Sequence, residues 1–167
     1  MAIDELLARH EAGGRAAVAR GEGLSAVPAL HTVLLTCMDC RIDAYSAFGL
    51  APGEVHVLRN AGGVVTDDVV RSMTISQRKL QTREVLLVRH AGCGLTSFTE
   101  EEFAEELADD TGMQPPWRTY AFGDPVVGVR RDMALLRRDP FLRPDTSIRG
   151  FVLDLQDGHL QEVDAGA

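Results

Sequence analysis

The chain has 167 residues, of which 45% are hydrophobic, and it carries 25 acidic against 17 basic residues, for a formal net charge of −8. This length predicts a single domain over residues 1–167, and the excess of acid argues against a nucleic-acid partner, which would need a basic face. No apolar run approaches the roughly 20 residues of a membrane span. The acidic start, Met1 to Glu5, is unlike a signal peptide. We therefore expect a cytoplasmic protein with no membrane partner.

Apolar residues recur at helical spacing near the N-terminus, between Ile3 and Val18. The pattern predicts a helical arm over residues 1–22 that Gly13-Gly14 interrupts or ends. A short amphipathic arm often needs a surface outside its own domain to cover it. The alternative interpretation is an ordinary surface helix.

Strand-like and helix-like patterns then alternate along the chain. Short apolar or alternating runs predict strands at residues 31–36, 54–58, 84–89 and 148–155, with a hairpin turn at 156–158 and a return strand at 159–163. Caps and helical spacing predict one turn at 44–50 and longer helices at 67–80, from residue 100, and at 124–138. The order strand, helix, strand implies a right-handed parallel crossover. The predicted class is α/β, with a mostly parallel central sheet flanked by helices.

Soft metal ligands directly follow two of these strands. Cys37-Met-Asp-Cys-Arg41 follows the first, and His90-Ala-Gly-Cys93 follows the third. Sites in open α/β sheets lie at the carboxyl ends of strands. Zinc binds thiolate and imidazole readily, so Cys37, His90 and Cys93 predict a zinc site. Three protein ligands leave a fourth position open, which is typical of catalytic zinc.

Asp39 and Arg41 supply what such a centre would need besides the metal. Two thiolates neutralise the charge of zinc, so the bound water should be acidified less than at an all-histidine site. Asp39 can accept a hydrogen bond from zinc-bound hydroxide and orient its attack, while Arg41 holds Asp39 ionised and aimed. In a different use of the same residues, Asp39 is the fourth ligand, its pairing with Arg41 breaks, and the site is closed.

Cys40 leaves two rival interpretations open. Cys37 and Cys40 have the spacing of a thioredoxin-like redox pair, although that motif usually opens a helix. Cys40 could instead be the fourth ligand of a closed structural Cys₃His zinc site. Such a site would have no use for the Asp39–Arg41 pair.

Residues of the second strand and the loop after it could also take part. Arg59 and Asn60 either line the site from the neighbouring strand or cap a turn. His56 alternates within the same strand and is interpreted as a core or interface residue.

Three motifs in this order resemble the β-class carbonic anhydrases: Cys37-x-Asp39-x-Arg41, Arg59-Asn60-Ala61-Gly62 and His90-x-x-Cys93-Gly94. A looser match continues to Arg149-Gly150-Phe151. The resemblance implies one Zn²⁺ per chain on Cys37, His90 and Cys93, with Asp39 and Arg41 as the catalytic dyad. It implies reversible hydration of CO₂ to bicarbonate and a proton.

The resemblance also implies features of the surroundings and the assembly. The substrate pocket or interface would include Arg59, Asn60, Ala61, Gly62 and Gly92. The protein would be a homodimer or an even-numbered homo-oligomer such as a tetramer, with the arm over residues 1–22 packed on a partner subunit.

The chain departs from the main pattern of the family in being short and in lacking, before Cys37, the glutamine that helps to hold substrate in typical members. It looks like a compact subgroup that is similar to carbonic anhydrases in some members and to carbonyl sulfide hydrolases in others. Both substrates are linear and are attacked at carbon, so the motifs do not choose between them. A zinc-binding homologue without catalysis is the third hypothesis.

Overall fold

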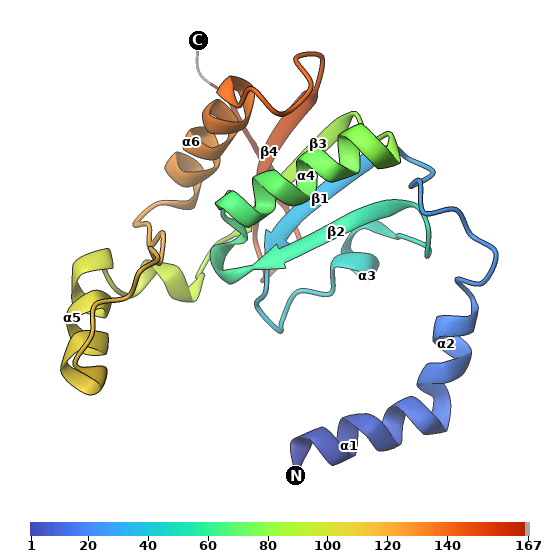
Figure 1. Ribbon diagram of the computed structural model, residues 1–167, viewed down its shortest axis with the longest axis horizontal. Helices are drawn as coiled ribbons and strands as arrows, with labels where there is room; N and C mark the ends of the chain where they lie inside the picture. The colour runs from blue at the N-terminus through green and yellow to red at the C-terminus, as the bar shows by residue number, and fades with distance from the viewer. Residues whose placement is uncertain (166–167) are drawn as a thin grey trace.

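The computed structural model describes residues 1–165, which form a five-stranded sheet in the order β2-β1-β3-β4-β5 (Figure 1). The first four strands in this order are parallel and the last is antiparallel to its neighbour: β2 Val55–Asn60, β1 Thr32–Cys37, β3 Glu84–His90, β4 Ser147–Leu153 and β5 Leu160–Val163. The predicted mostly parallel α/β sheet is confirmed. Two strands differ from their predicted ranges by two residues at the C-terminal end. β2 continues to Asn60, whereas β4 stops at Leu153 because the backbone of Asp154 already belongs to the turn, bonded to His159 and Gly158.

The helices begin at the residues whose side chains can cap them. These helices are α3 Ala44–Phe48, α4 Asp67–Leu80, α5 Glu100–Thr111 and α6 Pro125–Arg138. Thr66 and Asp124 accept hydrogen bonds from the first turns of α4 and α6, and Thr99 forms a capping box with Glu102 at α5. Two single 3₁₀ turns, η2 Ala61–Gly63 and η3 Gly94–Thr96, follow the strands β2 and β3.

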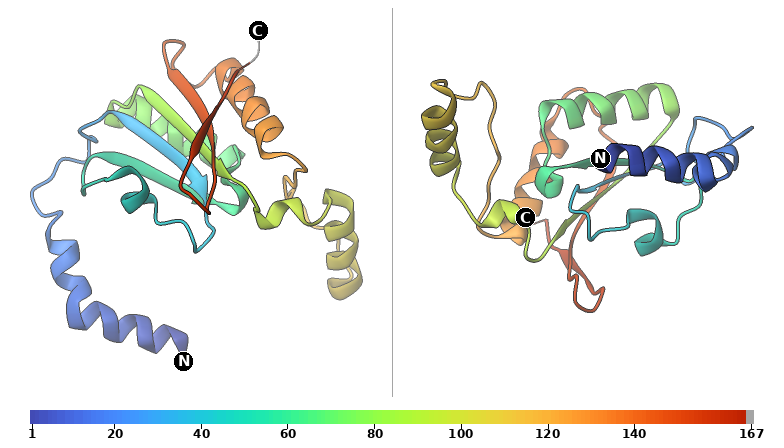
Figure 2. Two further views of the ribbon diagram at one scale, coloured as in Figure 1. Left: turned by 180° about the vertical axis from the view of Figure 1, so that it is seen from behind. Right: turned by 90° about the horizontal axis from the view of Figure 1, so that it is seen from below.

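The two faces of the sheet are covered unequally (Figure 2). The larger apolar cluster lies between the sheet and helices α4 and α6, and it includes Val33 and Leu87 from the strands with Met73 and Met133 from the helices. On the opposite face, Leu34 and its neighbours pack against the short helix α3. Strands β1 and β3 are therefore buried on both sides, as their continuous apolar sequences require.

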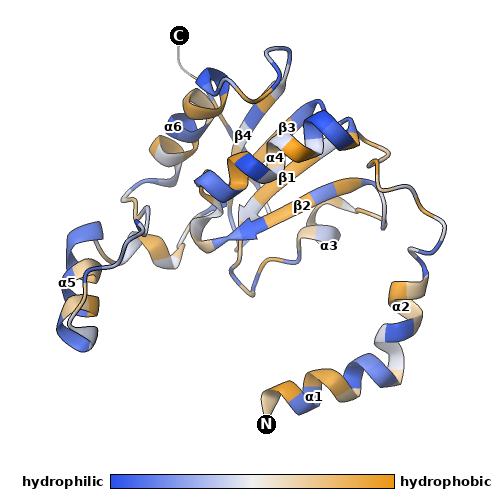
Figure 3. Ribbon diagram, viewed as in Figure 1, coloured by the Kyte–Doolittle hydropathy of each residue, from blue (hydrophilic) through white to orange (hydrophobic). Residues whose placement is uncertain are grey.

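The N-terminal arm is helical throughout but lies away from the sheet (Figure 1). It consists of α1 Ala2–Arg9, a π-helical segment η1 His10–Gly14 and α2 Arg15–Ala19. The glycine pair interrupts the regular α-helix by a π-helical turn and does not end it. None of the residues in these three segments is buried, and apolar and polar positions alternate along α1 (Figure 3). Across residues 1–165, every helix is too short or too polar to cross a membrane.

Candidate metal centre

Three predicted ligands meet at the carboxyl edge of the sheet. Cys37 is the last residue of β1, His90 is the last residue of the neighbouring strand β3, and Cys93 lies in the loop that follows. All three side chains are buried, and their ligand atoms lie within 4.8 Å of one another. The two Sγ atoms are 3.9 Å apart. Parallel pairing of β1 with β3 thus brings together ligands that are more than 50 residues apart in the sequence.

The imidazole of His90 is oriented for coordination by Nε2. Its Nδ1 lies 3.0 Å from the carbonyl oxygen of Ala91, which can only accept, so Nδ1 carries the proton and Nε2 has a free lone pair. Nε2 is buried and has no hydrogen-bond partner within residues 1–165. Burial lowers the pKa of His90, which favours the neutral imidazole that metals bind.

The backbone around Cys37 supports its thiol closely. The amide of Asp39 donates a hydrogen bond of 3.4 Å to the Sγ of Cys37. The loop after β2 presses on the same residue, since a Cβ at Gly63 would lie 2.9 Å from the amide nitrogen of Cys37. Gly63 has a φ of +60°, so both its conformation and the space around it require glycine.

Asp39 and Arg41 form a two-pronged ion pair beside the ligands. Arg41 Nε donates to Asp39 Oδ1 at 3.0 Å, and Nη2 donates to Oδ2 at 2.6 Å. The backbone amide of Arg41 also donates to Oδ1 at 3.0 Å, and Nη2 reaches the carbonyl of Gly92 at 3.1 Å. These side-chain and backbone hydrogen bonds from Arg41 hold the pKa of Asp39 well below its usual range. An ionised carboxylate therefore lies 3.7 Å from Nε2 of His90.

Cys40 lies outside this group of ligands. Its side chain is exposed, whereas Cys37 and Cys93 are buried. The Cys37-to-Cys40 segment does not open a helix either, since α3 begins only at Ala44 with Asp43 as its cap. The structure thus does not have the arrangement that either the redox pair or the closed Cys₃His site would need.

The sequence left two roles open for Arg59 and Asn60, and the structure shows that Arg59 supports the site while Asn60 caps a turn. Arg59 donates from Nε to the carbonyl of Cys37 at 2.9 Å and from Nη2 to the carbonyl of Asp39 at 2.8 Å. It therefore supports the loop that carries a ligand and the carboxylate. Asn60 instead closes the turn over η2 by paired hydrogen bonds with the backbone of Val64. His56 bonds to Ser76 and to the carbonyl of Ala26, which is a structural position.

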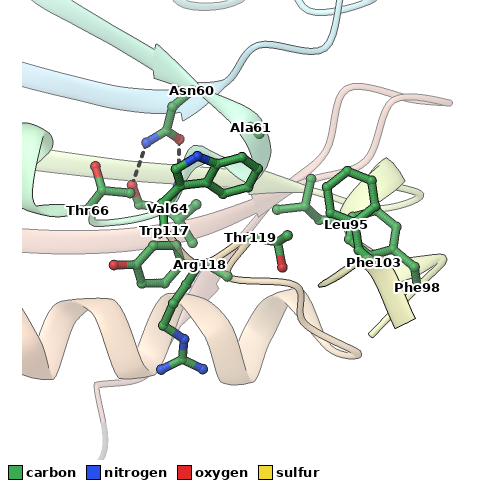
Figure 4. Close-up of a pocket in the computed structure, with 11 residues that line it drawn as sticks. Asn60, Ala61, Val64, Thr66, Leu95, Phe98, Phe103, Trp117, Arg118 and Thr119 are labelled. Atoms are coloured by element: carbon green, nitrogen blue, oxygen red, sulfur yellow. Dashed lines mark hydrogen bonds between the residues drawn. The ribbon is translucent and has the colours of Figure 1, made fainter. Parts of the chain in front are cut away.

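An aromatic pocket of about 360 Å³ lies next to the turn after β2 (Figure 4). Asn60 and Ala61 form part of its wall, and Figure 4 shows Leu95, Phe98 and Phe103 grouped on the far side. Leu95 also packs against the apolar cluster that contains Cys37 and Cys93, so the pocket adjoins the ligands. Of the other expected lining residues, Gly62 is packed against Leu95 and Phe122, and Gly92 accepts the hydrogen bond from Arg41.

The sequence motifs indicated Asn60 and Ala61 as pocket residues but not the aromatic wall opposite them. Its aromatic residues are Phe98 between η3 and α5, Phe103 of α5, and Trp117 and Tyr120 of the connection between α5 and α6. The only sequence signal for this wall was the aromatic content of the segment between α5 and α6. Aromatic content does not indicate which surface of the protein the segment covers.

Comparison with known proteins agrees with these motifs. The profile of the carbonic anhydrase family matches residues 32–117. β-Carbonic anhydrase 1 of Mycobacterium tuberculosis (strain H37Rv) is 46% identical over 136 residues, which cover 81% of this chain and 83% of that protein. A carbon disulfide hydrolase of Acidianus sp. (strain A1-3) is 32% identical over 153 residues, covering 77% of this chain and 75% of that protein.

Solved structures give the same result. A carbonic anhydrase from Streptococcus mutans superposes with a TM-score of 0.86 at 35% identity, over 98% of each chain. The apo form of a carbon disulfide hydrolase superposes with a TM-score of 0.74 at 28% identity, over 97% of this chain and 90% of the other. Fold, ligand group and matches define an enzyme of the lyase class. More specifically, the chain belongs to the β-carbonic anhydrase family.

Proposed function

We propose that this protein is a zinc-dependent carbonic anhydrase that catalyses the reversible hydration of CO₂ to bicarbonate and a proton. The observation that carries the proposal is the buried group Cys37, His90 and Cys93 with the intact Asp39–Arg41 pair beside it. A structural metal site would need the ligands but not the pair.

The donor set fits Zn²⁺. Two thiols and one imidazole are ligands that zinc prefers, and the unpartnered, buried Nε2 of His90 is the kind of atom that a metal would satisfy. When bound, zinc would supply a Lewis acid that makes water a stronger nucleophile near neutral pH. One ion per chain is the stoichiometry that three ligands from a single chain support.

The side chains beside the ligands would direct the attack on CO₂. Asp39 is ionised and can only accept hydrogen bonds. Its carboxylate would therefore accept a hydrogen bond from the O–H of the attacking oxygen and so orient that oxygen. Arg41 fixes both carboxylate oxygens of Asp39 and is itself tied to Gly92, in the loop of Cys93. The carboxylate is therefore positioned before substrate arrives, which lowers the cost of orientation during reaction.

The surroundings suit a small apolar substrate. Ile42, Leu95 and Phe122 pack around the two buried cysteines and exclude bulk water from that side. A linear molecule such as CO₂ makes no demand for charged partners, so these apolar walls would admit it.

A second candidate is hydrolysis of a linear sulfur compound, carbon disulfide or carbonyl sulfide. The observation that favours it is the presence of carbon disulfide hydrolases among the relatives in both sequence and structure. The same ligands and the same carboxylate would serve attack at carbon in either substrate. The higher identity to a protein named as a carbonic anhydrase places CO₂ first.

We further propose a homodimer or a larger even-numbered assembly in which the arm over residues 1–22 packs on a partner subunit. Ile3, Leu6, Leu7 and Val18 of the arm are between 61% and 70% exposed in the single chain, which supports a partner surface. We also propose a cytoplasmic location.

Stopped-flow turnover on a preparation with verified zinc content tests the function. The same preparation is offered CO₂, carbonyl sulfide and carbon disulfide separately, and a zinc-free Cys37→Ser variant gives the background rate. We expect rapid CO₂ hydration with weak turnover of both sulfur compounds. The reverse preference would establish the second candidate. Background rates on all three substrates, with one zinc per chain, would contradict both.

A further inference from the structure

A buried arginine lies directly behind the ligand His90. Arg89 is the penultimate residue of β3, and its side chain is 1% exposed, the largest side chain so fully buried within residues 1–165. Side chains alternate along a strand, so Arg89 points to the opposite face from His90, towards α6. Arginine is rarely buried to this extent without a specific partner.

The partner is Asp132 of α6, and it reaches two segments of the site at once. Its Oδ2 accepts a hydrogen bond of 2.7 Å from Arg89 Nη2 and another of 3.0 Å from the backbone amide of Val65. Val65 belongs to the loop after η2, whose Gly63 packs against the backbone of Cys37. One carboxylate therefore connects the end of β3, which bears His90, with the loop that presses on the end of β1, which bears Cys37.

The guanidinium also stacks on an aromatic ring that borders the ligands. Its Cζ lies 4.2 Å from the centroid of the Phe122 ring. Phe122 in turn packs on the cluster that contains Cys37 and Cys93. The flat cation thus supports the wall of the site from behind the sheet.

Helix α6 has a glycine where it passes the guanidinium. A Cβ at Gly128 would overlap Nη1 of Arg89. Glycine inside a helix is unfavourable relative to alanine, so its presence here needs a packing reason. The space occupied by Arg89 supplies that reason.

Stability alone does not account for this arrangement. A buried ion pair is often no more stabilising than apolar residues of the same volume, because both charges lose their hydration. Two guanidinium nitrogens of Arg89 have no hydrogen-bond partner within residues 1–165, which adds to that cost. Oδ1 of Asp132 lies 3.6 Å from Nε of Arg131 but likewise accepts no hydrogen bond within those residues. What the pair does provide is a fixed relation between β3, α6 and the loop at Val65.

We propose that Arg89 is a positioning residue of the metal centre, held by Asp132 and Phe122 so that His90, Cys37 and Cys93 keep the spacing that binds metal. This inference rests on the zinc centre of the proposed function and adds a residue to it. Arg89 does not touch the ligands' donor atoms or substrate and acts through the backbone and walls that carry them.

The test removes both charges together, so that neither is left buried alone. The variant Arg89→Met/Asp132→Asn loses the ion pair and the stack but keeps a side-chain oxygen for the amide of Val65. Arg149 and Glu162 offer a matched control, since Arg149 also pairs with a carboxylate and lies 5.1 Å from the ring of Phe151, but at the exposed edge of the sheet. The control variant is Arg149→Met/Glu162→Gln.

Zn²⁺ affinity, measured by competition with a chromogenic chelator, and the visible spectrum of the Co²⁺-loaded protein are the readouts. We expect the Arg89→Met/Asp132→Asn variant to melt close to the parent protein yet to bind Zn²⁺ about 10-fold more weakly, the lower end for residues that orient ligands. Its Co²⁺ bands should shift, while the control matches the parent in both readouts. Unchanged affinity and spectrum in the folded variant would overturn the inference.

A second variant covers the case in which the first does not fold. Phe122→Leu keeps the ion pair and an apolar wall but removes the flat ring, and we expect a weaker change in the same direction. Parent-like Zn²⁺ affinity and Co²⁺ spectrum in this variant would also overturn the inference. Neither readout uses CO₂: a parent protein that binds Zn²⁺ without hydrating CO₂ would refute the proposed function and leave this inference standing.

Discussion

The carboxyl edge of the sheet and the N-terminal arm differ in how far the single chain buries their side chains. At the edge, Cys37, His90 and Cys93 are at most 4% exposed. Cys37 accepts a hydrogen bond from the backbone amide of Asp39, and His90 donates one to the carbonyl of Ala91. In the arm, Leu6 and Leu7 are more than 60% exposed. Burying one such side chain contributes about 1.5–3 kcal/mol, a gain that the single chain does not realise. The edge is thus specified by the core of the domain, whereas none of the residues in the helices of the arm is buried by the single chain.

Removing a ligand should have the largest effect and should be confined to the edge. We expect Cys37→Ser or His90→Ala to bind less than one zinc per chain and to hydrate CO₂ more than 100-fold more slowly than the parent protein. The loss exceeds the roughly 10- to 100-fold effect of removing a residue that only orients a ligand. Metal analysis of the purified variants, together with stopped-flow rates, measures this. Either variant with one tightly bound zinc and parent-like rates would refute the ligand assignment.

Charged side chains on the apolar side of the arm should weaken the association of subunits without removing zinc from the metal centre. If each leucine contributes about 2 kcal/mol to the contact, Leu6→Asp/Leu7→Asp should weaken association by roughly 10³-fold for each arm that packs on a partner subunit. Light scattering across a concentration series measures the mass, and metal analysis measures the zinc retained.

The matched control for the arm reverses an ion pair on its polar side. Glu5→Lys/Arg9→Glu preserves the i,i+4 pairing of these residues, so the assembly should match the parent. An unchanged mass in the leucine variant would show that the arm is not an interface. Loss of zinc in that variant would break the contrast between the two regions.

The ion pair beside the ligands should affect turnover without affecting metal content. Asp39→Ala or Arg41→Ala would leave the three ligands in place but remove the fixed hydrogen-bond acceptor, and we expect roughly 100-fold lower kcat/KM with one zinc per chain. Stopped-flow assays on zinc-verified protein measure it. Parent-like rates from either variant would rule out an orienting role for the pair.

Cys40 should have the smallest effect of all. Its side chain is exposed and lies outside the group of ligands, so Cys40→Ser should keep one zinc per chain and activity within about two-fold of the parent. Zinc content and CO₂ hydration rate provide the measurement. Loss of metal would favour the closed site with four protein ligands.

Local sequence patterns predicted most of the fold and indicated where the ligands meet. The apolar runs that end at Cys37 and His90 predicted buried parallel strands, and parallel neighbours bring their carboxyl ends to one edge. Thr66 and Thr99 marked helix starts through short-range hydrogen bonds that depend on a few residues only.

Contacts between distant segments were not readable in this way. Arg89 and Asp132 are 43 residues apart, and nothing local indicates that a strand arginine and a helix carboxylate are buried together. The bonds from Arg59 to two carbonyls depend likewise on how β2 lies beside β1. The same limit applies to the aromatic pocket, since its wall joins Asn60 to a connection about 60 residues later.

The most direct test of a three-ligand centre with an oriented carboxylate is a crystal structure of the zinc-loaded protein, with anomalous diffraction recorded at the zinc edge. We expect one zinc peak per chain, bonded to Cys37, His90 and Cys93, with Asp39 still paired to Arg41. A peak bonded also to Cys40, or to Asp39 with the Arg41 pair broken, would show a site closed by four protein ligands and would contradict it.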